Sequence, residues 1–148
     1  MGRAIVHRLA VEGATVYALG RNKDRLAEIL EQATELRGNV HGTTLDLSDD
    51  SAVEAFFSEL PSLNVLVCCA GGSESNASAP IWKQSMSVID DILTNNLRTT
   101  IRTVAVASRH MIRRNEGRII CVSSVIGDHG KANFSGYAAA KSGINGFV

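Results

Sequence analysis

Tyr137 and Lys141 lie four positions apart, and they are the side chains of this sequence best placed to do chemistry. On a helix they point the same way, one turn apart. The lysine ammonium then stands beside the phenol, and a nearby positive charge favours the phenolate. A phenol that loses and regains a proton near neutral pH is a general acid and base. Ser124, 13 positions before Tyr137, supplies a second hydroxyl.

Helices and strands must position these residues, and the sequence alternates between the two. Apolar side chains at helical spacing predict helices over 3–12, 23–37, 48–60 and 87–114, and around Tyr137 and Lys141. Short β-rich runs predict strands over 15–19, 39–45, 65–70 and 118–123, with a Gly/Ser/Ala-rich loop over 71–80. The apolar runs at 65–70 and 118–123 are typical of strands covered on both faces.

Single residues mark where these elements begin and end. Gly13 suits the left-handed position after a helix. We expect Ser48 to cap the helix over 48–60, Pro61 to end it, and Gly117 to stop the helix over 87–114.

The alternation predicts an α/β fold, a Rossmann-like doubly wound parallel sheet with helices on both faces, as one domain over 1–148. Such a sheet normally has a central first strand, in the order 3-2-1-4-5-6. The sequence starts on a helix instead, which would leave the strands at 15–19 and 65–70 with unpaired edges. We therefore expect the first strand and the C-terminal strands to be missing, so that the domain is truncated.

Composition limits the class of protein. The 148 residues are 45% hydrophobic and 20% charged, with 15 basic and 15 acidic side chains, as in an ordinary soluble domain without a basic stripe for nucleic acid. We expect no membrane span, which needs about 18 apolar residues. The three cysteines have neither disulfide nor metal-ligand spacing, which favours core positions, no metal site and a reducing, cytoplasmic setting.

Five short motifs follow one another along the chain. They are Met1-Gly2-Arg3-Ala4-Ile5, Asp46-Leu47, Cys68-Cys69-Ala70-Gly71, Asn96-Leu97, and Ser123-Ser124 followed by Tyr137 and Lys141. Together they resemble the short-chain dehydrogenase/reductase superfamily in its short form. The resemblance spans essentially the whole chain and implies an NAD(P)-dependent oxidoreductase that acts on a small carbonyl compound or secondary alcohol.

The resemblance also implies catalytic roles. Tyr137 would exchange a proton with the substrate oxygen while a hydride moves to or from the nicotinamide. Lys141 would favour the Tyr137 phenolate and bind the nicotinamide ribose. Ser124 would hold the substrate oxygen, and Asn96 would keep a water that links Lys141 to solvent.

Two of these assignments have neighbouring alternatives. Asn96 is preferred to Asn95 because Leu97 follows it, as in the family pattern. Alone, Asn96 would more simply be a helix residue that bonds its own backbone. Ser124 is preferred to Ser123 on its spacing to Tyr137.

The cofactor residues that the resemblance implies are Gly2, Arg21, Asp46, Leu47, Ala70, Gly71, Tyr137 and Lys141. Asp46 would hold the adenine. An NAD site usually has an acidic residue at the end of the second strand, where it bonds the ribose 2′-hydroxyl. Gly20 stands there instead, followed by Arg21, which could pair with a 2′-phosphate. We therefore expect NADP(H) rather than NAD.

Three departures from the family pattern leave other functions open. The Gly-rich turn is reduced to Gly2, Cys68-Cys69 replaces two asparagines, and the substrate loop would lie beyond Val148. An inactive truncated remnant is one alternative, which at most pairs with a full-length relative through the helices at 97–114 and 136–148. An epimerase or dehydratase of the same superfamily is another. A full-length member would be a homo-oligomer.

Overall fold

The structure is a computed structural model that describes residues 1–72 and 78–148, so residues 73–77 of the predicted loop lie outside the described residues. The chain divides into two compact units, Met1–Leu47 and Ser48–Val148. The strands form two parallel pairs: β1 (Thr15–Gly20) with β2 (Asn39–Thr44), and β3 (Val65–Cys68) with β4 (Arg118–Cys121). The predicted α/β class with parallel strands is confirmed, whereas the single domain stays a prediction.

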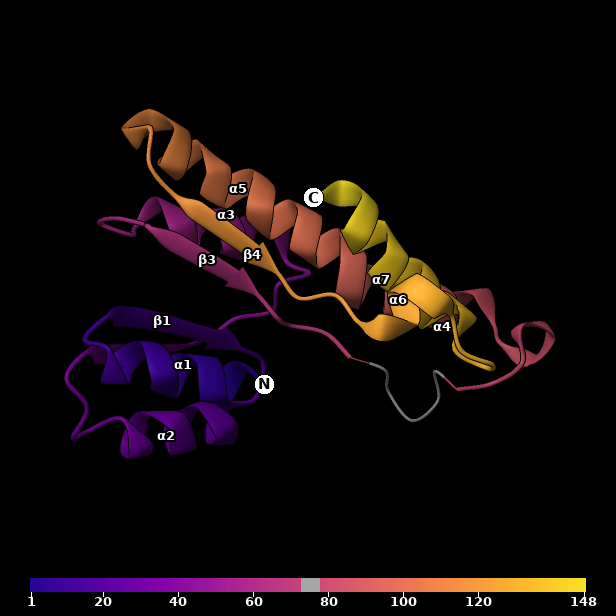
Figure 1. Cartoon of the computed structure of the whole chain (residues 1–148), viewed down its shortest axis with the longest axis horizontal. Helices are drawn as coiled ribbons and strands as arrows, with labels where there is room; N and C mark the ends of the chain where they lie inside the picture. The colour runs from indigo at the N-terminus through magenta and orange to yellow at the C-terminus, as the bar shows by residue number, and fades with distance from the viewer. Residues whose placement is uncertain (73–77) are drawn as a thin grey trace. The chain divides into compact units, whose positions relative to one another are not determined.

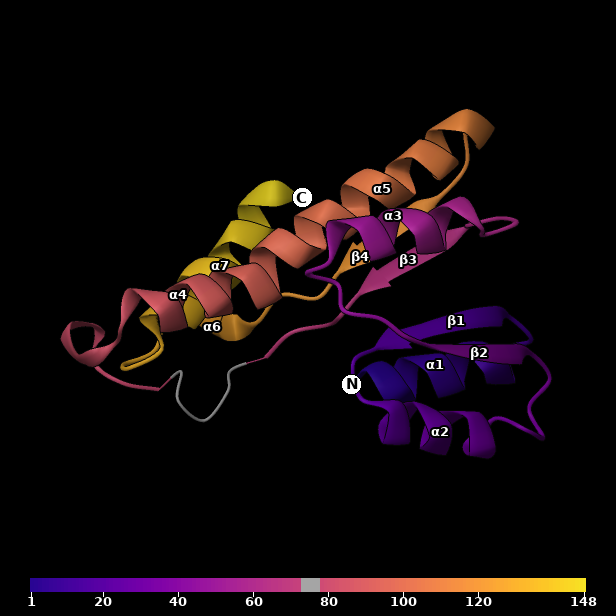
Figure 2. The same cartoon turned by 180° about the vertical axis from the view of Figure 1, so that it is seen from behind.

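In the first unit, two helices pack on one face of the β1–β2 pair (Figures 1 and 2). They are α1 (Gly2–Val11) and α2 (Lys23–Gln32). Gly13 follows α1 with a left-handed φ of 92°, as its position predicts. The prediction of a helix as far as residue 37 is wrong. The chain leaves the helix earlier because the Gly38 N–H bonds the Ala10 carbonyl at 2.8 Å, close against the Ala14 backbone.

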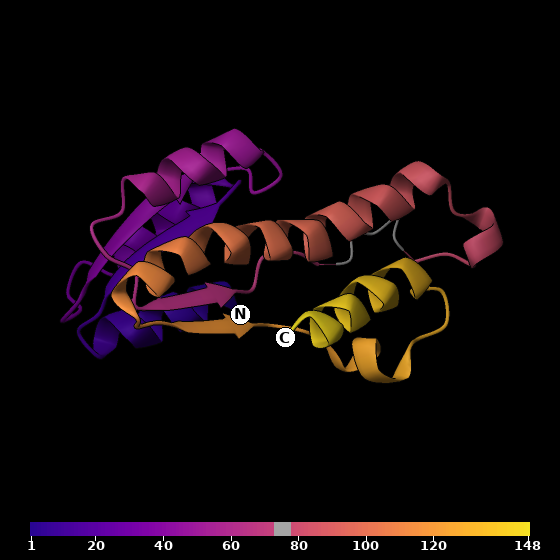
Figure 3. The same ribbon diagram turned by 90° about the horizontal axis from the view of Figure 1, so that it is seen from above.

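In the second unit, α5 (Thr99–Arg114) lies over the β3–β4 pair, and α3 (Asp50–Ser58) packs against α5 (Figure 3). The cap of α3 is Asp49 and not Ser48. Its Oδ1 accepts from the backbone N–H groups of Ser51 and Ala52, both at 3.0 Å. Aspartate and serine cap helices about equally well, so residue type alone does not decide between these neighbours.

The predicted helix over 87–114 consists of three segments. After the short 3₁₀ turn η2 (Ile81–Lys83) come α4 (Met86–Leu93), the π-helical η3 (Thr94–Arg98) and α5. Asn115, with a left-handed φ of 51°, ends α5 before the predicted stop at Gly117. Gly117 instead lies tightly against the Met111 side chain.

The β3–β4 pair is less covered than its apolar sequence predicts. Val65 and Ile120 are each 45% exposed, and the strands end at Cys68 and Cys121 rather than at 70 and 123. An apolar strand sequence therefore does not by itself show that both faces of the strand are covered by other elements. The three cysteines are free and half-buried. The predicted reducing compartment is not tested by this.

Two helices complete the second unit. A short helix, α6 (Val125–His129), occupies part of what the sequence predicts as a loop, and α7 (Ser135–Phe147) carries Tyr137 and Lys141. α7 runs beside α4, and α6 packs against it (Figures 1 and 3). None of the helices in the described parts of the chain is both long and apolar enough to cross a membrane.

Candidate active site

The Tyr137 and Lys141 side chains meet as their spacing predicts. Both lie on α7, and the Lys141 Nζ is 5.8 Å from the centre of the Tyr137 ring. Tyr137 packs against the buried pair Ile92 and Ala140, which fixes the ring between α4 and α7. A cation over an aromatic face at this distance is attracted to it. The structure thus joins the phenol and the ammonium in one place.

Lys141 is a buried cation with a specific partner. Only 5% of the residue is exposed, and its Nζ donates to the Val122 carbonyl at 3.0 Å. Burial lowers the pKa of Lys141, because it disfavours the charged form, and the nearby Cys69 acts in the opposite direction with a smaller effect than burial. An ammonium has three N–H donors, and Val122 uses one of them.

The segment between β4 and α6 carries the two serines. The Ser124 Oγ accepts from the Ile126 N–H at 3.3 Å and so caps α6. A hydroxyl that accepts in this way keeps its own proton for donation. The Ser123 Oγ donates to the Lys141 carbonyl at 3.0 Å. Ser123 is therefore committed to the backbone of α7, and Ser124 remains the candidate to contact a substrate.

Asn96 is fully buried in η3, and its amide makes three hydrogen bonds. The Oδ1 accepts from the Gly72 N–H at 2.9 Å, and the Nδ2 donates to the carbonyls of Gly72 at 3.1 Å and Ile92 at 2.9 Å. The side chain thus bonds its own helix, as the simpler interpretation held, and also a loop 24 residues away. Its predicted role in holding a water stays a prediction.

The loop after β3 is built around Asn96. Gly71 has a left-handed φ of 113°, and a Cβ there would lie 2.5 Å from the Asn96 Oδ1. Only glycine fits so close to the amide. Ala70, just before it, is exposed. Ala70 and Gly71 therefore lie in a turn fixed from behind by Asn96, within the same unit as Tyr137 and Lys141.

Small residues let α7 approach the helices beside it. A Cβ at Gly143 would lie 2.7 Å from the Leu97 side chain, and one at Gly136 would touch Ile92 at 3.5 Å. Ala140, between them, is completely buried. These positions share one face of α7, so this face sets the distance from Asn96 to the Tyr137 helix.

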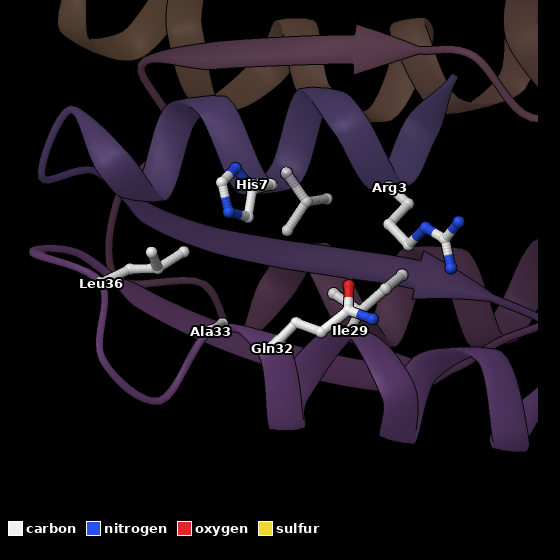
Figure 4. Close-up of a pocket in the computed structure, with 7 residues that line it drawn as sticks. Arg3, His7, Ile29, Gln32, Ala33 and Leu36 are labelled. Atoms are coloured by element: carbon white, nitrogen blue, oxygen red, sulfur yellow. The ribbon is translucent and has the colours of Figure 1, made fainter.

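The other predicted cofactor residues lie in the first unit. Arg21 directly follows β1, while Asp46 and Leu47 follow β2, and in parallel strands these carboxyl ends share one edge of the sheet. Gly2 begins α1, and in Figure 4 the adjacent Arg3 lies toward the arrowhead of the strand behind it. The first unit thus brings its four predicted residues to one end.

The first unit also has a small pocket. It opens between α1 and α2 and is lined by Arg3, His7, Ile29 and Gln32, among others (Figure 4). Its free volume is about 10 Å³, room for one water molecule and not for a nucleotide. In the parts that the structure describes, no three His, Cys, Asp or Glu side chains come together as metal ligands.

Sequence reasoning missed three residues that hold the site together. Gly72 is the partner of Asn96, the Val122 carbonyl is the partner of Lys141, and Gly127 packs against the Lys141 backbone. Two of them act through backbone atoms, which carry no signal in residue type. The third is a glycine within a helical turn, and that is a weak hint of close packing.

Comparison with known proteins identifies the family of this chain. The family model for short chain dehydrogenases matches residues 1–148. The 3-oxoacyl-(acyl-carrier-protein) reductase FabG of Vibrio harveyi is 33% identical, over 100% of this chain and 60% of that protein. The 2-dehydro-3-deoxy-L-rhamnonate dehydrogenase (NAD(+)) of a Sphingomonas species is 30% identical, over 100% of this chain and 59% of that protein.

Solved structures show the same likeness. An NAD⁺-bound xylitol dehydrogenase superposes with a TM-score of 0.91 at 25% identity, over 99% of this chain and 57% of that one. A short-chain type dehydrogenase/reductase from Mycobacterium ulcerans has a TM-score of 0.93 at 24% identity, over 99% and 55%, and supports the fold. The chain spans about 60% of the length of the curated relatives it matches. The family match over the whole chain nonetheless shows that this protein belongs to the short-chain dehydrogenase family.

Proposed function

We propose that this chain is part of an oxidoreductase that transfers a hydride between NADP(H) and a small carbonyl or secondary alcohol, with Tyr137 as the general acid and base. The observation that carries the proposal is the buried Lys141 ammonium, 5.8 Å from the Tyr137 ring and bonded to Val122, two residues before Ser124. A cation kept dry beside a phenol has little function in a merely structural helix, because its burial is costly.

Four side chains of the second unit have separate roles in the proposed reaction. Tyr137 gives its phenolic proton to the substrate oxygen in reduction and takes one back in oxidation. Lys141 stabilises the phenolate through its charge. Ser124 donates a hydrogen bond from its hydroxyl to the same substrate oxygen and keeps its proton, which stabilises the negative charge that develops there. Asn96 holds the turn at Gly71 in place through its bonds to Gly72.

Each unit, taken by itself, offers groups that suit part of a nicotinamide dinucleotide. The bound cofactor would supply or accept the hydride. Lys141 has N–H donors beyond the one that Val122 uses, enough for ribose hydroxyls. Apart from its chain neighbours, no atom of the described residues would lie within 4 Å of a Cβ at Gly20, and exposed Arg21 follows it. This arrangement suits a 2′-phosphate and favours NADP(H). For the diphosphate, the chain offers the N-terminus of α1 at Gly2.

Tyr137→Phe tests the proposed acid. The substitution keeps the ring and its packing and removes only the hydroxyl, so NADPH binding should persist while turnover of a small carbonyl falls about 100- to 10,000-fold. Tyr17→Phe is the matched control, since the other tyrosine lies on β1, stacked on His41. Equal turnover in Tyr137→Phe and the wild type would refute Tyr137 as the acid.

Titration of the wild-type chain with NADPH and NADH tests the inactive-remnant alternative and the choice of cofactor. Arg21→Ala should weaken NADPH binding more than NADH binding, whereas Lys23→Ala, two positions on, should change neither by more than about twofold. Absence of any cofactor binding would favour the inactive remnant. An unchanged NADPH preference in Arg21→Ala would remove the argument for NADP(H).

We also propose self-association through α5 and α7, as the family resemblance implies. Ile101 and Ile112 on α5 and Phe147 at the end of α7 are exposed apolar side chains. Light scattering with size-exclusion chromatography would detect a dimer or tetramer, and a monomer at all concentrations would contradict the proposal.

A further inference from the structure

The segment after β4 forms two hydrogen bonds with Lys141. The Lys141 ammonium donates to the Val122 carbonyl, and the Lys141 carbonyl accepts from the Ser123 hydroxyl, each at 3.0 Å. Val122 and Ser123 are neighbours, so two consecutive residues hold the far end of the lysine side chain and its own backbone. The Val122 N–H in turn donates to the Cys68 carbonyl at 2.8 Å, which connects this segment to the end of β3.

The same segment touches α7 again one turn later. A Cβ on Gly127 would lie 2.8 Å from the Lys141 carbonyl carbon and 3.0 Å from its Cβ, so α6 lies directly against the Lys141 backbone. The Gly127 carbonyl accepts from the Ser142 hydroxyl, and the Asn145 Nδ2 donates to the Asp128 Oδ1 at 2.7 Å. These contacts leave α7 little freedom to slide along α6.

We propose that Ser123 is a positioning residue whose hydroxyl fixes the Lys141 turn of α7, and so keeps the ammonium buried at Val122 and beside Tyr137. Its consequence for catalysis rests on the proposed function, but its effect on Lys141 does not. A backbone carbonyl has two lone pairs, so the Lys141 carbonyl can accept the Ser123 hydroxyl in addition to a helix N–H. Since Ser124 follows directly, the same bond also sets where the Ser124 hydroxyl lies relative to Lys141.

Ser123 would therefore act through Lys141 and touch no substrate. A merely structural serine would lower the stability of the unit without a specific effect on Lys141. The two roles separate in the titration of the Lys141 ammonium, which reports how well that group is shielded from water. They also separate in amide hydrogen exchange over 141–145, the turn whose first carbonyl Ser123 holds.

The test compares Ser123→Ala with Ser123→Thr, which keeps the hydroxyl, and with Ser108→Ala as the matched control. Ser108 makes the same kind of bond, from its Oγ to the Val104 carbonyl at 2.7 Å, but within α5. The Lys141 side-chain resonance, assigned with Lys141→Met, is followed by NMR against pH. Exchange over 141–145 is measured by mass spectrometry.

Loss of one hydrogen bond should speed exchange over 141–145 by about 5- to 10-fold in Ser123→Ala. The Lys141 midpoint should also move up toward its ordinary value, because the freed ammonium reaches water. Ser123→Thr should stay within about twofold of the wild type, and Ser108→Ala should leave α7 unchanged. Ser123→Ala that matches the wild type in both measurements would overturn the proposal, as would an equal response in Ser108→Ala.

Ser123→Cys covers the case in which Ser123→Ala does not fold, because it fills the same space with a weaker donor than the hydroxyl. It should speed exchange over the same turn, and no change there would count against the proposal. The experiment distinguishes a failure of the proposed function from a failure of this proposal about Ser123. Wild-type protein would then show no NADPH-dependent turnover, while the Lys141 titration would still respond to Ser123→Ala.

Discussion

Asn96→Ala should lower the free energy of unfolding of the second unit more than Asn95→Ala, the truncation of the other amide in η3. The side chain is fully buried and makes three hydrogen bonds, two to Gly72 and one to Ile92. Each bond contributes a net of about 0.5–1.5 kcal/mol. Gly72 is exposed, so water can replace part of what is lost there. We therefore expect a loss of about 2–4 kcal/mol in the free energy of unfolding.

The loss can be measured by urea and thermal unfolding followed by circular dichroism. For a chain of this size it corresponds to a fall in Tm of roughly 5–15 °C. Asn95→Ala is the matched control. Asn95 is half-buried, and its carbonyl, which accepts from the Thr99 hydroxyl, survives the substitution. It should cost less than about 1 kcal/mol.

Asn96→Asp refines the test. A carboxylate keeps the acceptor for the Gly72 N–H, but it faces the Gly72 and Ile92 carbonyls without a proton to donate. Burial favours its neutral form, so the variant should be least stable near neutral pH and recover as the pH falls. Equal losses in Asn96→Ala and Asn95→Ala, within about 0.5 kcal/mol, would refute the role assigned to the Asn96 bonds.

Two further predictions concern single contacts. Gly71→Ala should cost about 1–3 kcal/mol, because of its left-handed φ and the clash with Asn96, and less in an Asn96→Ala background. Additive losses in that double-mutant cycle of urea midpoints would argue against the contact. The Ser51 hydroxyl, followed by the Ala52 N–H, lowers the pKa of Asp49 below 3.8. The ionised Asp49 carboxylate therefore stabilises the folded state at pH values above 3.8, and this contribution is lost as the pH falls through the lowered pKa. Asp49→Asn should reduce the pH dependence of the urea midpoint over this acid range. A pH dependence equal to that of the wild type would contradict this prediction.

Local spacing was enough to predict the part of the site that lies on one helix. Tyr137 and Lys141 meet because four residues make about one helical turn, whatever surrounds the helix. The left-handed turn at Gly13 followed in the same way from residue type. The parallel α/β class followed from the order of apolar runs and helical patterns.

Features that depend on distant partners were beyond the sequence. The π turn at Asn96 interrupts a periodicity that predicts one continuous helix, and the Asn96 amide there bonds Gly72, 24 residues away. The exposure of Val65 and Ile120 depends on which layers cover the sheet, which an apolar run does not specify. The cap at Asp49 rather than Ser48 was a competition between two good capping residues.

The bond from Lys141 to Val122 affects how rate losses in variants should be read. Val122 bonds β3 through its N–H and the Lys141 side chain through its carbonyl, so the lysine anchors the backbone just after β4. Any substitution of Lys141 thus leaves the Val122 carbonyl without this partner as well as removing a charge. A loss of activity in a Lys141 variant would therefore include damage to the scaffold, whereas Tyr137→Phe leaves these bonds in place and would report on the proposed proton transfer alone.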